Sequence, residues 1–217
     1  MHAHAAPLHQ VILVEDVACP DVRARAAAES IARGADATLT VQASTAATRA
    51  GADLVVFSRG DGGPPYSSPL GDIGHLHRLP RLVVAQTWPP TRFVAGYDAS
   101  PAAHAAALVA ATIAAALSLP MELVFAAGDA AAESPRGRWS IDQFLESGAT
   151  RVAHRSGVRP RVSVAPGPPI QALLDASGPD ALLAVGVRPA TRTRQTTGVA
   201  TGLLHAAIGP LLVIPEV

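Results

Sequence analysis

The stretch FVAGYDASPAAHAAALVAATIAAALSLPMELVFA, residues 93–126, decides the fold. It opens with a short apolar run at residues 93–97 that predicts a buried strand, and residues 121–126 predict another. Ser100 is a favourable helix N-cap and Pro101 suits the first helical position, so an alanine-rich helix separates the two strands. A strand, a helix and a strand in this order form a βαβ unit, which predicts an α/β fold with a parallel sheet.

The same alternation continues to the C-terminus and gives a complete second half of five strands and four helices. Its further strands are predicted at residues 161–165, 180–185 and 211–214, and its further helices at residues 139–154, 168–176 and 198–207. The strands are continuous apolar runs, which is expected where helices cover both faces of a sheet.

The first half repeats this pattern in a shorter form. Strands are predicted at residues 11–15, 38–41, 53–57 and 81–85, and helices at residues 20–33, 44–49 and 70–77. Gly34 is expected to end the first of these helices as a C-terminal cap. The segments GADLVVF and PRLVVAQ parallel GPDALLAV and GPLLVIP of the second half. Because only four strands are predicted, the first half lacks one α–β unit, either after its first helix or after its second strand.

A linker separates the two halves. Pro89 and Pro90 follow Trp88, and two consecutive prolines continue neither a helix nor a central strand. We therefore predict two tandem Rossmann-like parallel-sheet halves, with an abbreviated domain at residues 1–88 and a complete domain at residues 92–217.

The composition indicates which kinds of binding partner and which cellular compartment to expect. The chain has 17 basic and 17 acidic residues, so its zero formal charge gives no attraction to nucleic acid or to an anionic membrane. Cys19 is the single cysteine, which rules out a disulfide within the chain and fits a reducing compartment. Residues 1–10 lack the basic region of a secretion signal, and the alanine-rich residues 102–119 are too weakly apolar to span a membrane. We therefore expect a cytoplasmic protein with no nucleic-acid or membrane partner.

Two segments carry a resemblance to a known family. FVAGYDAS, residues 93–100, is followed by an alanine-rich helix and resembles the opening G-x-D-x-S strand and turn of universal stress proteins. DALLAVGVR, residues 180–188, followed by a loop and by GLLHAAIGPLLVIP, residues 202–215, resembles the closing segment of that family. The resemblance covers residues 92–217 well and residues 1–88 more weakly.

The resemblance implies a stress-response regulatory protein of the Rossmann-like type that binds an adenine nucleotide (ATP, AMP or ADP) or carries no ligand. Members commonly dimerise through the last strand, so this chain could form a homodimer or pair its own halves as an intramolecular pseudo-dimer. The resemblance places the nucleotide in the second half, with Asp98 holding the adenosine. The implied nucleotide-binding residues are Gly96, Tyr97, Asp98, Ser100, Gly186, Arg188, Thr197 and Gly198. An aspartate after a strand also forms turns by bonding its own backbone, and for Asp98 both interpretations stay open.

The phosphate loop departs from the family pattern G-x2-G-x9-G-[ST]. Gly186 fills the first glycine position, but the second is Pro189, which has no N–H to donate. The closing small pair falls on residues 197–198, so the loop is about two residues short. Arg188 and its neighbouring arginines could supply charge that the backbone does not.

The first half is expected to lack a phosphate site. Phe57 stands where its first glycine would be, and Asp72 stands near the hydroxyl position, where a carboxylate would repel phosphate. The nearby His75 and His77 have no obvious carboxylate or cysteine partner, so no metal is predicted.

Three functional hypotheses remain from the sequence. The first is a nucleotide-responsive binding module. The second is an interaction protein that keeps the fold with a degenerate phosphate loop and binds no nucleotide. The third is an enzyme using the same cleft, for example for slow ATP hydrolysis. Catalysis requires a positioned base or metal, and because the sequence nominates neither, no catalytic residue is assigned.

Overall fold

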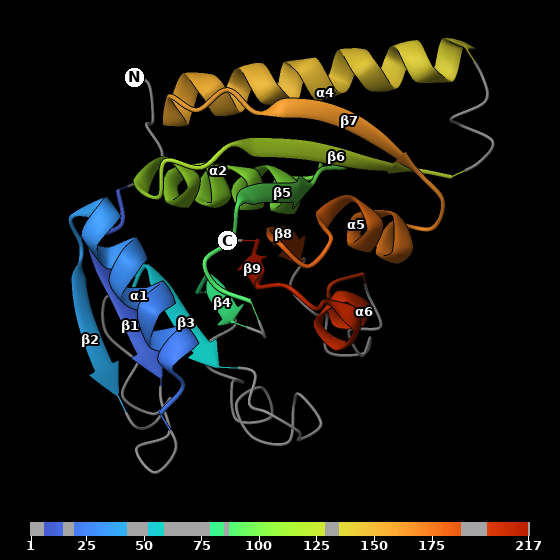
Figure 1. Cartoon of the computed structure of the whole chain (residues 1–217). Helices are drawn as coiled ribbons and strands as arrows, with labels where there is room; N and C mark the ends of the chain where they lie inside the picture. Colours follow the sequence, from blue (N-terminus) through green and yellow to red (C-terminus); the bar gives the residue numbers. More distant parts are fainter. Residues whose placement is uncertain are drawn as a thin grey trace.

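One nine-stranded sheet forms the centre of the molecule, with the strand order β2-β1-β3-β4-β9-β8-β5-β6-β7 (Figure 1). The computed structural model describes residues 7–14, 20–42, 52–58, 79–84, 87–128, 135–187 and 199–216. The strands are β1 (Gln10–Val14), β2 (Thr38–Gln42), β3 (Leu54–Ser58), β4 (Arg81–Val84), β5 (Arg92–Gly96), β6 (Met121–Ala127), β7 (Arg161–Pro166), β8 (Ala181–Val187) and β9 (Leu211–Pro215). Every neighbouring pair is parallel except β4 and β9, which confirms the predicted α/β fold class.

The second half contains the predicted five strands and four helices. Its helices are α2 (Pro101–Ala116), α4 (Pro135–Ser156), α5 (Pro169–Ser177) and α6 (Val199–Ala206). The side chain of Ser100 caps α2 by accepting a hydrogen bond of 3.1 Å from the N–H of Ala103, as the sequence predicted. α4 begins earlier than predicted, at Pro135 instead of residue 139.

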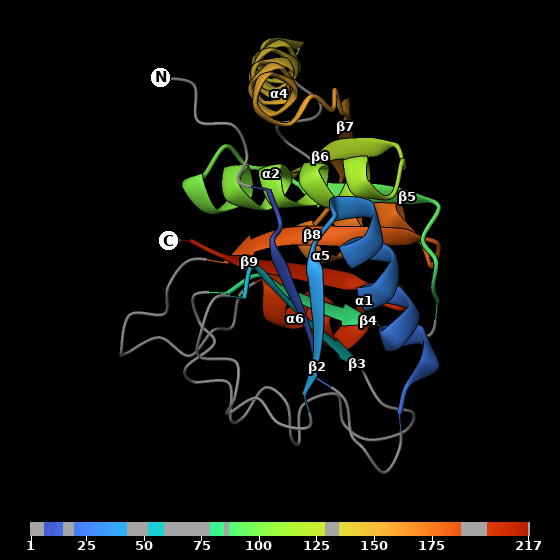
Figure 2. The same ribbon diagram turned by 90° about the vertical axis from the view of Figure 1, so that its left-hand side faces the viewer.

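Helices cover the sheet on both sides. α1 (Val22–Ala35), α2 and α4 pack on one face, where their buried residues join the inward side chains of the strands in the largest core cluster (Figure 2). α5 and α6 pack on the opposite face of the second half and form a separate core cluster with β8 and β9. The predicted helices at residues 44–49 and 70–77 lie outside the described residues.

Gly34 does not end α1, contrary to the prediction. The helix continues to Ala35, and Asp36 caps it in the left-handed conformation with φ of 53°. Gly34 instead allows α1 to approach α2 of the other half, because a Cβ there would lie 2.1 Å from the carbonyl oxygen of Ala116. Close packing of two helices, and not backbone conformation, therefore explains this glycine.

The strand order shows which unit the first half lacks. In the second half, β6 is flanked on its outer side by β7, whereas its counterpart β2 is the outermost strand of the first half. The missing strand is therefore the one that would follow β2. Among the described residues, the order of the strands therefore favours one of the two alternatives left open by the sequence, a unit missing after the second strand.

The two halves join through their last strands, β4 and β9, around a local twofold relation. Leu82 lies opposite Leu212, with Arg81 opposite Val213 and Val83 opposite Leu211. Leu82 and Leu212 are thus counterparts that face each other. Extending this equivalence through the strand registers makes Ser58 of β3 the counterpart of Gly186 in β8.

Candidate functional site

The candidate site lies where the strand order of the second half reverses. β5 pairs with β6 on one side and with β8 on the other, and the chain leaves their carboxyl ends in different directions. In open parallel sheets, ligands bind in the crevice outside the carboxyl ends at such a switch point. The turn after β5, the first turn of α2 and the end of β8 meet there.

Asp98 forms the turn between β5 and α2. Its carboxylate Oδ1 accepts a hydrogen bond of 2.9 Å from the N–H of Ser100, and Ala99 between them has a φ of 62°. This is the turn-forming role that the sequence left open. The Asp98 side chain is nevertheless exposed, so its carboxylate can also be reached from the crevice.

The glycines at the ends of β5 and β8 lie against other elements. A Cβ on Gly186 would come within 2.2 Å of the carbonyl oxygen of Ala102, in the first turn of α2. A Cβ on Gly96 would lie 3.0 Å from Cδ1 of Leu173 in α5. Helix packing alone therefore requires a glycine at residue 186, whether or not a ligand binds.

Tyr97 points into the helix layer. Its side chain is only 2% exposed, its ring stacks on Phe144 with centroids 6.2 Å apart, and its hydroxyl accepts a hydrogen bond of 3.2 Å from Arg151. Gly148 of α4 makes room for the ring, because a Cβ there would lie 2.6 Å from Cε1 of Tyr97. The N–H of Tyr97 donates to the carbonyl oxygen of Val124 at 2.9 Å, so both the ring and this N–H serve the packing and pairing of the fold.

The predicted loop residues Arg188, Thr197 and Gly198 lie outside the described residues, as does Pro189. Their assignment to nucleotide binding stays a prediction. Of the eight residues proposed from the sequence, the structure thus brings five to the switch point: Gly96, Tyr97, Asp98, Ser100 and Gly186.

The switch point of the first half carries a carboxylate at the start of its helix. Asp21 caps α1 and accepts hydrogen bonds from the N–H of Arg23 at 2.8 Å and from the hydroxyl of Ser58. Burial raises the pKa of Asp21, but the hydrogen bonds from Ser58 and Arg23 outweigh it and hold the pKa below its ordinary value. Asp21 is therefore a negative charge held at the N-terminus of α1.

The structural counterpart of Gly186 differs from the one predicted. The sequence comparison placed Phe57 at this position, but the strand registers assign it to Ser58, one residue later. Phe57 instead lies 4% exposed in a small core cluster on the face opposite α1. The error arose because apolar runs can be aligned one residue out of step without any visible mismatch.

A cluster of His104 with two arginines beside Tyr97 could not be predicted from the sequence. His104 of α2 lies edge-on to the Tyr97 ring, with centroids 6.4 Å apart. Its pKa is lowered by burial first and then by the positive charges of Arg151 and Arg155 on α4. The residues are far apart in the chain, and only the packing of α2 on α4 brings them together, so no spacing in the sequence indicates the group.

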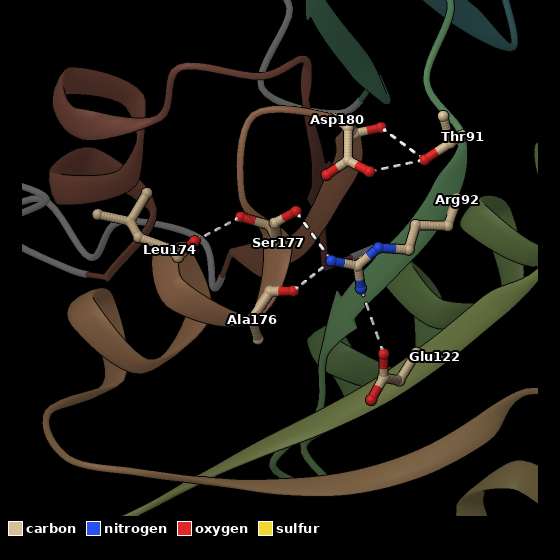
Figure 3. A network of polar contacts seen from close by, with 7 residues as sticks. All are labelled: Thr91, Arg92, Glu122, Leu174, Ala176, Ser177 and Asp180. Carbon is tan, nitrogen blue, oxygen red and sulfur yellow. Dashed lines mark hydrogen bonds and ion pairs between the residues drawn. The ribbon is translucent and has the colours of Figure 1, made fainter.

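A second polar network lies at the opposite, amino ends of the strands and has a structural role (Figure 3). Arg92 at the start of β5 donates to the carbonyl oxygens of Ala176 and Ser177 at the end of α5, at 2.8 and 3.2 Å. It also pairs with Glu122 of β6 at 3.4 Å. One guanidinium therefore joins two strands and satisfies the end of a helix.

The described part of the chain contains neither a cluster of metal ligands nor a membrane-spanning helix. Among those residues, no group of three or more His, Cys, Asp or Glu side chains is arranged to hold a metal ion. No helix within the same residues has the length and apolar character needed to cross a membrane.

Comparison with known proteins supports the fold through structure alone. No protein-family model matches the chain, and no curated protein is significantly similar to it. A universal stress protein from Archaeoglobus fulgidus DSM 4304 is similar over 96% of this chain and 88% of its own, with 13% identity and a TM-score of 0.59. The protein PA1789 from Pseudomonas aeruginosa PAO1, described as functionally unknown, is similar over 96% of this chain and 93% of its own, with 11% identity and a TM-score of 0.63.

A shorter match concerns a universal stress protein solved in complex with cAMP. It covers 59% of this chain and 98% of that protein, with 17% identity and a TM-score of 0.49, a score at which the similarity says nothing about what this chain binds. The longer matches span both halves. The chain therefore has the universal stress protein fold in a tandem arrangement, with its first half truncated.

Proposed function

We propose that this chain is a universal stress protein-like regulatory protein whose second half binds an adenine nucleotide, ATP or its AMP and ADP relatives, while its first half binds none. The observation that carries the proposal is a difference between the two helix caps. The helix at the second switch point is capped by the neutral Ser100, and the helix at the first is capped by the charged Asp21.

The cap decides whether a phosphate is favoured at the helix N-terminus. The aligned peptide dipoles place about half a positive charge there. Ser100 satisfies a backbone N–H without supplying charge, so the cap itself adds no repulsion to an anion at the N-terminus of α2, where the nearest carboxylate is that of Asp98 in the preceding turn. Asp21 already compensates this charge in α1, and its carboxylate would repel a phosphate.

Asp98 supplies the second recognition element. One of its oxygens is held by the N–H of Ser100, which fixes the carboxylate at the end of β5 while its side chain remains exposed. A fixed carboxylate can accept hydrogen bonds from the hydroxyls of a ribose. The proposed nucleotide thus places its nucleoside at Asp98 and its phosphates toward the N-terminus of α2 and the loop after β8.

The test gives helix α2 the same type of cap as helix α1. Thermal shift and calorimetric titration would compare ATP, AMP and adenosine on the wild-type chain and on Ser100→Asp, which keeps a cap but adds a charge. A ligand at a hundredfold excess over its Kd stabilises the folded chain by about 2.7 kcal/mol. We expect Ser100→Asp to weaken ATP binding at least tenfold, about 1.4 kcal/mol, while adenosine binding changes far less.

Two further variants complete the test. Asp98→Asn keeps an oxygen for the turn and should weaken all three ligands, because it removes the charge that recognises the nucleoside. Glu29→Gln removes an exposed carboxylate from α1 and should leave binding unchanged. No stabilisation by any of the three ligands, or equal losses for ATP and adenosine in Ser100→Asp, would refute the proposed site.

The alternative is an interaction module that keeps the fold but binds no nucleotide. The packing of Gly186 against Ala102 favours it, because this glycine needs no phosphate to explain it. Pro189, without an N–H, favours it as well. Wild-type protein that gives no response to ATP, AMP and adenosine, and copurifies with no nucleotide, would establish this alternative.

The arrangement of the halves and the compartment belong to the same proposal. The twofold pairing of β4 with β9 around Leu82 and Leu212 supports an intramolecular pseudo-dimer, which needs no second chain to complete it. A single cysteine and a balanced charge support a cytoplasmic protein without a nucleic-acid or membrane partner.

A further inference from the structure

Among the described strands, β2 forms one edge of the sheet. β2 is the outermost strand at one end of the strand order, and Figure 2 shows it on the side that faces the viewer. By the strand registers, Val41 of β2 is the counterpart of Leu123 in β6. Leu123 is fully buried beside β7, whereas Val41 is 47% exposed. The first half therefore exposes a strand whose counterpart is central.

The register identifies which backbone groups are directed outward. The N–H of Thr38 donates to the carbonyl oxygen of His9 at 2.9 Å, so Thr38, Thr40 and Gln42 direct their backbone groups toward β1. Leu39 and Val41 alternate with them and direct two N–H and two C=O groups away from the sheet. Within the described part of the chain, no strand pairs with this side of β2.

The two edges of the sheet are protected differently. Natural edge strands usually carry a charge or a proline that discourages pairing with another chain. β7, the other edge, follows Pro160, begins with Arg161 and ends with Pro166. β2 has the sequence TLTVQ, which contains neither a charged residue nor a proline. Only the β2 edge therefore lacks such protection.

We propose that β2 pairs antiparallel with β2 of a second copy of this chain, around a twofold axis at Thr40. In this register Leu39 faces Val41 of the second copy, and these outward-directed residues exchange two hydrogen bonds on each side of the axis, about four in all. The neutral strand brings no like charges together. The chain already uses the same geometry internally, where Leu82 and Leu212 centre the pairing of β4 with β9.

A second copy suits this edge better than a continuous assembly. Pairing of β2 with β7 of another copy would be head-to-tail and would extend without closing, and Pro166 offers no N–H to such a ladder. Twofold pairing closes at a dimer. Because two short edge strands bury much less than the roughly 1,600 Å² of a standard interface, we expect a weak dimer with a dissociation constant of about 100 μM.

Hydrogen exchange at single amides tests the pairing on the full chain. At about 10 μM the amides of Leu39 and Val41 should exchange rapidly, and near 1 mM they should be protected, because only the dimer gives them partners. The amide of Thr40, which is bonded within the sheet, should be protected at both concentrations. Sedimentation velocity over the same range should show a reversible monomer–dimer equilibrium without larger species.

Two variants of Val41 test whether the dimer forms through the β2 edge or through another surface. Val41→Lys adds a charge at the edge, and Val41→Pro removes an outward N–H without touching the bonds to β1, so both should abolish the dimer. Ile208→Lys alters another aliphatic residue, 58% exposed beside β9, and should leave the dimer unchanged. Circular dichroism would verify that each variant is folded.

Several outcomes would overturn the proposal. A wild-type chain that is monomeric at 1 mM refutes it, and so does a dimer that survives both Val41 variants. Protection of Leu39 and Val41 that is independent of concentration would mean that another segment of this chain covers the edge. Species that keep growing with concentration would mean an open assembly in place of the closed dimer.

Discussion

Ser58 at the end of β3 donates a hydrogen bond to the carboxylate of Asp21, a residue 37 positions earlier in the chain that caps α1. The contact fastens the end of a strand to the start of a helix across the first switch point. The same place in the second half holds Gly186 and Ser100, a smaller and uncharged pair. The caps of the two helices thus differ in charge, and the carboxylate near the start of α2 is instead the exposed Asp98, two residues before the cap.

Replacing Ser58 with alanine should make the chain less stable at neutral pH. The side chain of Asp21 is only 11% exposed, so a lost hydrogen bond to its charge should cost about 1–2 kcal/mol. Without Ser58 the pKa of Asp21 should rise, because the hydrogen bond from this hydroxyl stabilises the charged carboxylate more than its other contacts do. Urea unfolding at about pH 7 measures the loss.

The loss of stability in Ser58→Ala should depend on pH. Asp21 has a lower pKa in the folded chain than in the unfolded chain, so its contribution is fully present above the ordinary value of 3.8 and is lost as pH falls through the folded pKa. Wild-type and Ser58→Ala should therefore differ most near neutrality and converge in strong acid. A difference that stays constant down to about pH 2 would show that the hydroxyl acts through packing and not through the charge.

Arg92 should be the most consequential arginine among those with described partners. Arg92→Met removes the donor to two carbonyl oxygens of α5 and the ion pair with Glu122, and we expect a loss of about 1–3 kcal/mol. Arg159→Met is the matched control, since that side chain is 69% exposed and its ion-pair partner among the described residues is the exposed Glu146. Its effect should stay within about 0.5 kcal/mol. Equal losses in denaturant unfolding would contradict the structural role of the network.

Much of the fold could be predicted because each strand is a continuous apolar run and each helix carries local start signals. The pair Ser100-Pro101 predicted the start of α2 to the residue. The same local logic failed at Gly34, where a glycine near a helix end suggested a cap. Its cause is a contact with Ala116, which lies in the other half of the chain, and no local pattern contains that information.

At the candidate site, the sequence could predict only the local structure that a residue forms with its neighbours in the chain. The position of Asp98 at the end of a strand indicated both a turn and a binding role, and the turn is present. The contact of Asp21 with Ser58 depends on strand order and register, and the group of His104 with Arg151 depends on helix packing. Such arrangements arise from tertiary structure, so they are invisible in sequence spacing.

Gly186→Ala tests whether this glycine is required by packing. The added Cβ would meet the backbone of α2 at Ala102, which cannot move aside as a flexible side chain can, so we expect a loss of about 2–3 kcal/mol without any ligand. Gly128→Ala is the control, because a Cβ there meets nothing within 4 Å. Equal stability of the two variants in thermal unfolding would show that packing does not require a glycine at residue 186. Ligand binding would then be the remaining explanation for Gly186.

Gly34 and Gly202 offer a sharper comparison, because both lie inside helices, where alanine is intrinsically favoured over glycine by about 1 kcal/mol. A Cβ on Gly34 would meet the carbonyl oxygen of Ala116, whereas a Cβ on Gly202 would meet the terminal Cδ1 of Ile170, which can rotate away. Gly34→Ala should therefore destabilise the chain by about 1–3 kcal/mol in spite of its helix propensity, and Gly202→Ala should be close to neutral. If Gly34→Ala proves as stable as Gly202→Ala in denaturant unfolding, then α1 and α2 are not in direct backbone contact. The two halves would in that case be held together mainly by the pairing of β4 with β9.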